Sequence, residues 1–204
     1  MLKKLFTFLV AIFILSGTYV HANGDITAGK EKVGLCVACH GQDGNGVDAL
    51  PNQPRLAGQH AEYAEKQLRD FKNGSRNNPI MAPMVASLSD EDISDISAYY
   101  ASLKGTIGES SPENAAVGEK LYRAGDADKG LAACMACHGP NGKGNPAAKY
   151  PSVYGQYAEY TAIQLKAFKS ETRDNDLNSV MRSIAAKMTN EEIEAVSGYI
   201  EGLH

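Results

Sequence analysis

Two short stretches of the chain combine cysteine and histidine at a spacing suited to covalent attachment of a haem. They read Cys36-Val37-Ala38-Cys39-His40 and Cys134-Met135-Ala136-Cys137-His138. Two thiols three positions apart share one helical turn, so each can add to a haem vinyl group, and the next residue places an imidazole beneath the iron. The predicted covalent attachment residues are Cys36, Cys39, Cys134 and Cys137, and the predicted proximal iron ligands are His40 and His138.

Other uses of paired cysteines explain less of the pattern. The two Cys-x-x-Cys pairs could close one structural zinc site, or each could be a thioredoxin-like redox motif. A zinc site requires the pairs to converge, whereas each lies inside its own copy of a larger repeat. A thioredoxin-like motif lacks the preceding strand-helix-strand pattern and leaves the histidine in both copies unexplained.

The haem motifs belong to an internal duplication that covers nearly the whole chain after its first 22 residues. A period near 100 residues indicates tandem domains and not a solenoid. A nine-residue insertion, around Ala124 to Ala132, precedes the second motif and is expected in a surface loop. The equivalent pairs include Gly29 and Gly118, Cys36 and Cys134, Pro54 and Pro151, Gln59 and Gln156, Met81 and Met181, and Ser89 and Thr189.

The duplication also selects candidates for the second axial ligand. Only Met81 and Met181 occupy equivalent positions, in what we expect to be a loop before the last helix of each repeat. Met84 and Met188 align with aliphatic residues, which favours the core, and Met135 sits between two cysteines. We therefore predict Met81 and Met181 as the sixth ligands of two His/Met haem irons.

The remaining histidines offer no matching alternative. His60 aligns with a tyrosine and is expected to be exposed, His204 ends the chain, and His21 lies in the amino-terminal segment. Bis-histidine ligation is thus not supported in both copies. Because a six-coordinate iron has no free position for a substrate, the sequence predicts electron transfer and not an enzyme.

Helical patterns account for the rest of each repeat. Gly29 and Gly118 lie in a first helix and suggest a close approach by the last one. That last helix begins at a capping box, Ser89 to Asp92 in one copy and Thr189 to Glu192 in the other. We expect its apolar stripes to form the core: Ile93, Ile96, Tyr100 and Leu103, and Ile193, Val196, Ile200 and Leu203. No strand pattern is evident, so the predicted fold is all-α.

The predicted organisation is a signal peptide over residues 1–22, an amino-terminal domain over 23–103, a linker over 104–113 and a carboxy-terminal domain over 114–204. Two lysines followed by an apolar run too short to span a bilayer indicate export, and we expect a bacterial periplasm. The net charge of −4 becomes −6 when those lysines are removed, which argues against nucleic acid as a partner.

The motifs CVACHG, PRLAGQ and MAP before LSDEDI, followed by CMACHG, YPSVYGQ and MRSIAAKM, resemble the dihaem cytochrome c4 family. The resemblance implies two class I cytochrome c folds related by a pseudo-two-fold axis, with the haem propionate edges facing each other. It implies that the carbonyls of Pro54 and Pro151 hold the proximal histidines. The residues alone support this role and a simple turn-forming role equally. Ser152 stands where the first repeat has Arg55, so the haem potentials should differ if this position touches a propionate.

The same resemblance implies a periplasmic carrier with two covalent haem c groups. Its redox partners would be a quinol-oxidising complex and a haem-copper terminal oxidase. The carrier would be a monomer that docks on the periphery of these membrane complexes. One alternative is an electron-transfer subunit of a flavocytochrome-type dehydrogenase, which has a similar tandem fold. A dihaem peroxidase is a third hypothesis, but it needs an open haem, and the second copy of the methionine argues against it.

Overall fold

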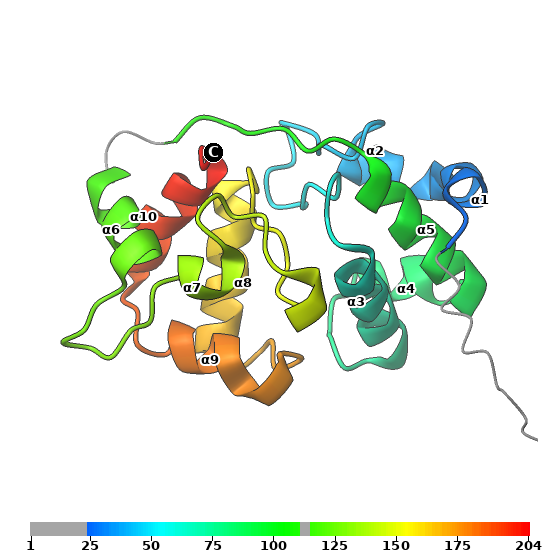
Figure 1. The fold of residues 1–204 in the computed structure, drawn as a ribbon. Coiled ribbons are helices and arrows are strands. Elements are labelled where there is room, and N and C mark those ends of the chain that lie inside the picture. Colours follow the sequence, from blue (N-terminus) through cyan, green and yellow to red (C-terminus); the bar gives the residue numbers. More distant parts are fainter. Residues whose placement is uncertain (1–23, 111–114) are drawn as a thin grey trace, which may run out of the picture.

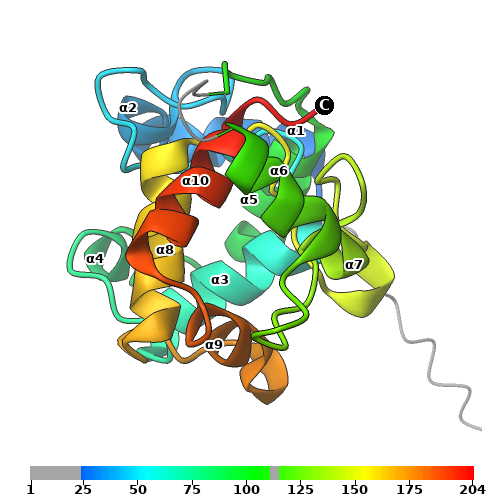
Figure 2. The same ribbon diagram turned by 90° about the vertical axis from the view of Figure 1, so that its left-hand side faces the viewer.

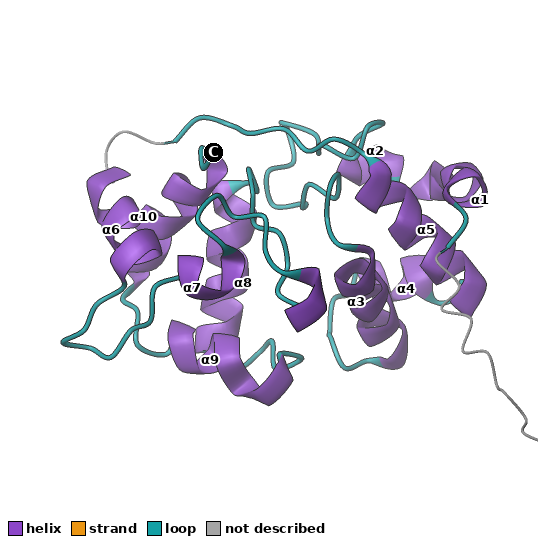
Figure 3. Cartoon of the chain, viewed as in Figure 1, coloured by secondary structure: helices purple, strands orange, loops and turns teal. Residues whose placement is uncertain are grey.

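The computed structural model describes residues 24–110 and 115–204, and within them the chain is helical (Figures 1 and 3). The predicted signal peptide, 1–22, lies outside the described residues. Within these ranges, β-type pairing is limited to two isolated bridges, Asp126 with Leu131 and Asn145 with Tyr150. The all-α prediction is therefore confirmed.

Each repeat forms a helical domain whose α-helices follow the same order, while the short 3₁₀ turns differ. The amino-terminal domain contains α1 (Ile26–Lys32), the 3₁₀ turn η1 (Val33–Leu35), α2 (Val37–His40), α3 (Ala61–Asn73), α4 (Met81–Val85) and α5 (Asp90–Ser102). The carboxy-terminal domain contains α6 (Ala115–Ala124), α7 (Met135–His138), η3 (Pro146–Ala148), α8 (Ala158–Lys169), η4 (Leu177–Ser179), α9 (Val180–Ala185) and α10 (Asn190–Glu201). Figure 2 views the second domain end-on, with α6, α8 and α10 nearest.

The first and last helices of each domain cross at a glycine. A Cβ atom on Gly29 would lie 2.1 Å from the carbonyl oxygen of Asp95 in α5, and one on Gly118 would lie 2.2 Å from that of Ala195 in α10. Only a hydrogen atom fits in that space, which confirms the predicted close approach. The entropic cost of a helical glycine is offset by the packing that it allows.

The helix ends follow the predicted chemistry. Asp25 caps α1 by accepting from the backbone N–H groups of Thr27 and Ala28. Both capping boxes form, at Ser89 for α5 and at Thr189 for α10. Orphan N–H groups at each helix start are thereby satisfied.

The predicted stripes form the two cores. Ile93 and Ile193 are fully buried, and the cores extend to Ile96, Tyr99 and Tyr100 on α5 and to Val196 and Ile200 on α10. The insertion near 124–132 is not wholly a surface loop, because Leu131 is 5% exposed and joins the second core.

The predicted linker, 104–113, contacts both domains in its described part (Figure 1). The N–H of Thr106 donates to the amide oxygen of Asn45 at 2.8 Å, and the N–H of Gly108 donates to the carbonyl of Glu201 at 2.9 Å. The described part of the linker is thus tied to a loop of the first domain and to the end of α10 in the second.

Candidate functional site

Each Cys-x-x-Cys-His motif forms a single helical turn, α2 or α7. The first cysteine of each motif is the N-cap, and its carbonyl accepts from the N–H of the histidine, at 3.0 Å for Cys36 and 2.9 Å for Cys134. The turn ends at a glycine with positive φ, Gly41 or Gly139. This compact turn presents both thiols and the imidazole of a motif together, as the predicted attachment chemistry requires.

The geometry fixes the tautomer of both candidate proximal histidines. Nδ1 of His40 lies 2.8 Å from the carbonyl oxygen of Pro54, and Nδ1 of His138 lies 2.9 Å from that of Pro151. A carbonyl only accepts, so Nδ1 carries the proton and Nε2 keeps its lone pair. Burial lowers the pKa of both imidazoles, against a smaller opposing effect of these hydrogen bonds, so the neutral form is favoured.

The four thiols are unpaired and partly buried. Burial raises the pKa of the Cys36 thiol, and it raises that of Cys134 to about 11. Across residues 24–110 and 115–204, no three side chains of the types that ligate zinc gather at one point. The structure thus gives no support to the zinc hypothesis.

Met81 and Met181 lie in short helices and not in the loop that the sequence suggested. Met81 begins α4, where the amide oxygen of Asn78 accepts from its N–H at 2.9 Å. Pro83 is tolerated inside α4 because it stands in the first turn, where no intrahelical N–H bond is needed. Met181 is the second residue of α9 and packs against the carboxy-terminal core.

The structure corrects two residue-level expectations. Met188 is 3% exposed, as predicted for core, but Met84 is 47% exposed, because α4 turns it outward although its counterpart Ile184 packs on a core. His60 is partly buried and not free: its Nε2 lies 2.8 Å from the carbonyl oxygen of Lys143 in the other domain. The interface that encloses His60 has no signature in local sequence.

Sequence reasoning also missed a buried polar cluster between the domains. Arg76 and Arg173 are 8% and 7% exposed. The guanidinium of Arg76 donates to Gln67 at 2.8 Å, and across the interface to Tyr160 at 3.0 Å and Gln164 at 2.8 Å. The two arginines occupy equivalent positions in the repeat, and that equivalence was the signal available.

The cluster is reciprocal, as expected for an interface with two-fold pseudosymmetry. Arg173 donates to Gln164 within its own domain at 2.8 Å, and across the interface to Tyr63 and Gln67 at 3.0 Å each. Burial alone would raise the pKa of Tyr160, but the two guanidinium groups outweigh burial and lower it.

These surroundings suit a haem in each domain. In the described part of the chain, Nε2 of both proximal histidines makes no hydrogen bond, so the metal-binding lone pair is available. Among the described residues, four buried side-chain polar atoms lack a hydrogen-bond partner: the Arg55 Nε and the hydroxyls of Ser97, Tyr100 and Ser197. An acidic cofactor beside Arg55 would give its unpartnered Nε an acceptor.

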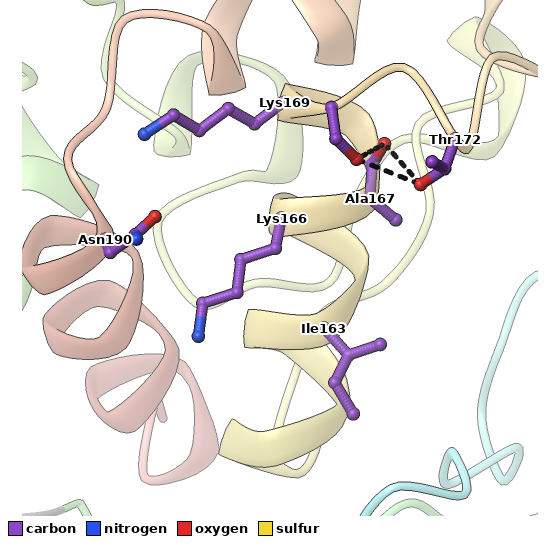
Figure 4. Close-up of a pocket in the computed structure, with 7 residues that line it drawn as sticks. Ile163, Lys166, Ala167, Lys169, Thr172 and Asn190 are labelled. Carbon is purple, nitrogen blue, oxygen red and sulfur yellow. Dashed lines mark hydrogen bonds between the residues drawn. The ribbon is translucent and has the colours of Figure 1, made fainter.

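A separate hollow between α8 and α10 lacks the residues that would hold a haem (Figure 4). Its lysines are engaged, Lys166 by Glu194 at 2.6 Å and Lys169 by the carbonyl of Met188 at 2.7 Å. Thr172 bonds the carbonyl of Ala167 at 3.3 Å. It contains neither a haem-attachment cysteine nor a candidate axial ligand.

Two tandem helical domains, each with a Cys-x-x-Cys-His turn and a histidine whose Nδ1–H donates to a proline carbonyl, define a c-type cytochrome with duplicated domains. The family model for cytochrome c matches residues 26–104 and 115–204. Cytochrome c4 from Stutzerimonas stutzeri is 47% identical over 96% of this chain and 98% of its own. The crystal structure of reduced recombinant cytochrome c4 from Pseudomonas stutzeri superposes with a TM-score of 0.86 at 48% identity, covering 89% of this chain and all of that one.

The chain belongs to the cytochrome c4 family. It is a dihaem electron carrier with two covalently bound haem c groups, and it is not an enzyme. A further relative, the thiosulfate dehydrogenase electron acceptor of Stutzerimonas stutzeri strain A1501, is 41% identical over 80% of this chain and 76% of its own. Among the described residues, no helix is both long enough and apolar enough to cross a membrane.

Proposed function

We propose that each domain holds one haem through its paired cysteines, with His40 and Met81 as the axial ligands in the first domain and His138 and Met181 in the second. The observation that carries this assignment is the equivalence of the two sites: each has a neutral histidine with Nδ1 bonded to a proline carbonyl. The bound haems would supply one-electron redox chemistry.

The residues of the chain supply orientation and exclusion of water. The proline carbonyls hold each imidazole ring in one plane and one tautomer, and they increase its basicity. The cysteines would hold the haem covalently in one position. The packing around the two histidines limits their access to solvent. A thioether in the sixth position favours reduced iron and raises the potential.

We further propose that the carrier works in a bacterial periplasm between a quinol-oxidising complex and a haem-copper terminal oxidase. The apolar amino-terminal segment supports export, and the acidic balance supports protein partners and not nucleic acid. The tandem domains provide two redox centres, so one electron can enter at one domain and leave at the other.

The spectrum of the purified protein tests the ligand assignment. We expect two covalent haems per chain and the near-infrared sulfur-to-iron band at full intensity in the oxidised form. Replacing Met81 with alanine should remove half of that band, and replacing both methionines should remove all of it. A Met84→Ala variant is the matched control and should keep the band. A high-spin signal in the unmodified protein would contradict the proposal.

A second candidate follows from the similarity to a thiosulfate dehydrogenase electron acceptor. In that case the donor would be a sulfur-oxidising dehydrogenase, in line with the alternative role as a dehydrogenase's electron-transfer partner. Stopped-flow reduction of the oxidised carrier separates the two. Faster reduction by a thiosulfate dehydrogenase with thiosulfate than by a quinol-oxidising complex with quinol would favour the second candidate.

A further inference from the structure

Two equivalent glutamines, Gln59 and Gln156, each reach across the domain boundary to the backbone N–H and carbonyl of one residue. The amide oxygen of Gln156 accepts from the N–H of Arg55 at 2.9 Å, and its amide nitrogen donates to the carbonyl of Arg55 at 2.9 Å. In the same way, Gln59 accepts from the N–H of Ser152 at 3.0 Å and donates to the carbonyl of Ser152 at 2.9 Å. Residue type at 55 and 152 differs, but the backbone contacts do not.

The contacted peptide groups are those that hold the candidate proximal histidines. The N–H of Arg55 and the carbonyl of Pro54 belong to one peptide unit, and that carbonyl accepts from Nδ1 of His40 at 2.8 Å. A hydrogen bond from an amide N–H polarises the amide and makes its carbonyl a better acceptor. Gln156 in the second domain thus strengthens the bond that orients the histidine of the first.

The equivalent path of hydrogen bonds from Gln59 runs from the first domain to the histidine of the second. Gln59 of the first domain accepts from the N–H of Ser152, whose peptide unit includes the carbonyl of Pro151, and that carbonyl accepts from Nδ1 of His138 at 2.9 Å. The carbonyl partner of a ligating histidine increases the basicity of the ligand. Each domain therefore contributes to the electronic state of the other domain's ligand.

The glutamines are held in place by their own helices. The N–H of His60, the N-cap residue of α3, donates to the amide oxygen of Gln59 at 3.0 Å, and the N–H of Tyr157, the N-cap residue of α8, donates to that of Gln156 at 3.1 Å. Both side chains are partly buried. Each glutamine is thus oriented by the start of one domain's helix toward the other domain's loop.

We infer that Gln59 and Gln156 are positioning residues that act crosswise, each tuning the proximal histidine of the opposite domain through a shared peptide group. The inference rests on the ligand assignment proposed above. Loss of a glutamine acceptor leaves the opposite imidazole less basic, which stabilises oxidised iron less. The potential of the haem in the opposite domain should then rise, and that of the haem in the same domain should not.

The test uses the full-length protein with both haems, reduced and labelled with ¹⁵N-histidine. The readouts are the Nδ1–H resonances of His40 and His138 and the two midpoint potentials. Gln156→Met should move the His40 resonance to lower chemical shift and raise the potential of the first haem alone. Gln59→Met should do the same to His138 and the second haem. Each variant is the matched control of the other.

Conservative variants distinguish the relay from a structural role. Gln156→Glu and Gln59→Glu keep an acceptor oxygen for the N–H, so the opposite Nδ1–H resonance should return to its original shift or move beyond it. A glutamate variant that matches the methionine variant would overturn the inference, as would a shift within the same domain, equal shifts in both domains, or none. If the unmodified protein shows no haem-shifted Nδ1–H resonance, the ligand assignment itself fails.

Discussion

At the scale of single residues, the chemistry depends on hydrogen bonds that prepare each side chain before any cofactor is considered. The proline carbonyls accept a hydrogen bond from Nδ1–H and so favour the tautomer with an unprotonated Nε2, which is the form that iron binds. Burial favours the neutral imidazole in the same direction. A histidine without that carbonyl could rotate or change tautomer.

The sixth ligand gives the first residue-scale prediction. Met81→His should lower the potential of the first haem by ~0.1–0.3 V, within the range of about 0.8 V that axial ligands cover, because imidazole stabilises oxidised iron more than a thioether does. Spectroelectrochemical titration of both haems measures the shift. Met84→His is the control, since Met84 is 47% exposed on the same short helix and should change neither potential. An equal effect of both variants would contradict the assignment.

Residue chemistry was more predictable than residue surroundings. The two haem motifs, the paired methionines and the capping boxes follow from spacing and duplication. The positions of His60 and Met84 did not, because each depends on an orientation or an interface that no local pattern encodes. Pro54 and Pro151 show the limit of prediction from sequence. The residues alone supported a turn-forming role and a histidine-binding role equally, and the distance from each carbonyl oxygen to a histidine Nδ1 decides for the second.

At the scale of helices, the two glycine crossings set how closely the first and last helices pack. Gly29→Ala would place a methyl group 2.1 Å from a carbonyl oxygen of α5, and we expect a loss of about 3 kcal/mol in the free energy of unfolding. Chemical denaturation of the full-length protein measures it. Gly34→Ala is the control, because no atom lies within 4 Å of its Cβ position. An equal loss at Gly34 would contradict the packing argument, because alanine has the higher helix propensity and leaves no other reason for the loss.

The two crossings differ in charge, which gives a prediction on pH. In the first domain, Lys32 bonds Asp95 at 2.7 Å, and Asp95 also accepts from the N–H of Asp25 at 2.7 Å. The hydrogen bond from Lys32 has the largest effect and that from the Asp25 N–H the next, and together they hold the pKa of Asp95 below its ordinary value of 3.8. The equivalent positions in the second domain are Leu121 and Ala195, both buried in its core.

A lowered carboxyl pKa stabilises the fold above the ordinary pKa, and this contribution is lost as the pH falls through the folded pKa. Acidification from about pH 5 to about pH 3 should therefore reduce hydrogen-exchange protection in α1 more than in α6, after correction for intrinsic rates. Asp95→Asn should reduce this difference between the helices and not abolish it, because Lys32 also pairs with Asp92 at 2.8 Å. Equal acid sensitivity of α1 and α6 in the unmodified protein would refute the role of the ion pair.

At the scale of the whole molecule, reciprocal polar contacts join the two domains. The arginine cluster, the crossed glutamines and the bound linker all pair a group of one domain with a group of the other. The duplicated haem motifs predicted tandem domains, but the residues that form the interface between them could be identified only from the folded structure. Its residues are polar, and in sequence they look like ordinary surface positions.

Coupling between the domains gives the last prediction. Arg76→Met and Arg173→Met should each cost about 1.5–3 kcal/mol, because each removes charged hydrogen bonds to buried tyrosine and glutamine partners. With both replaced, the domains should unfold in two separate calorimetric transitions in place of one. Lys166→Met is the control, since its surface pairing with Glu194 lies within one domain. A single transition in the double variant would mean that the glutamines and the linker suffice to couple the domains.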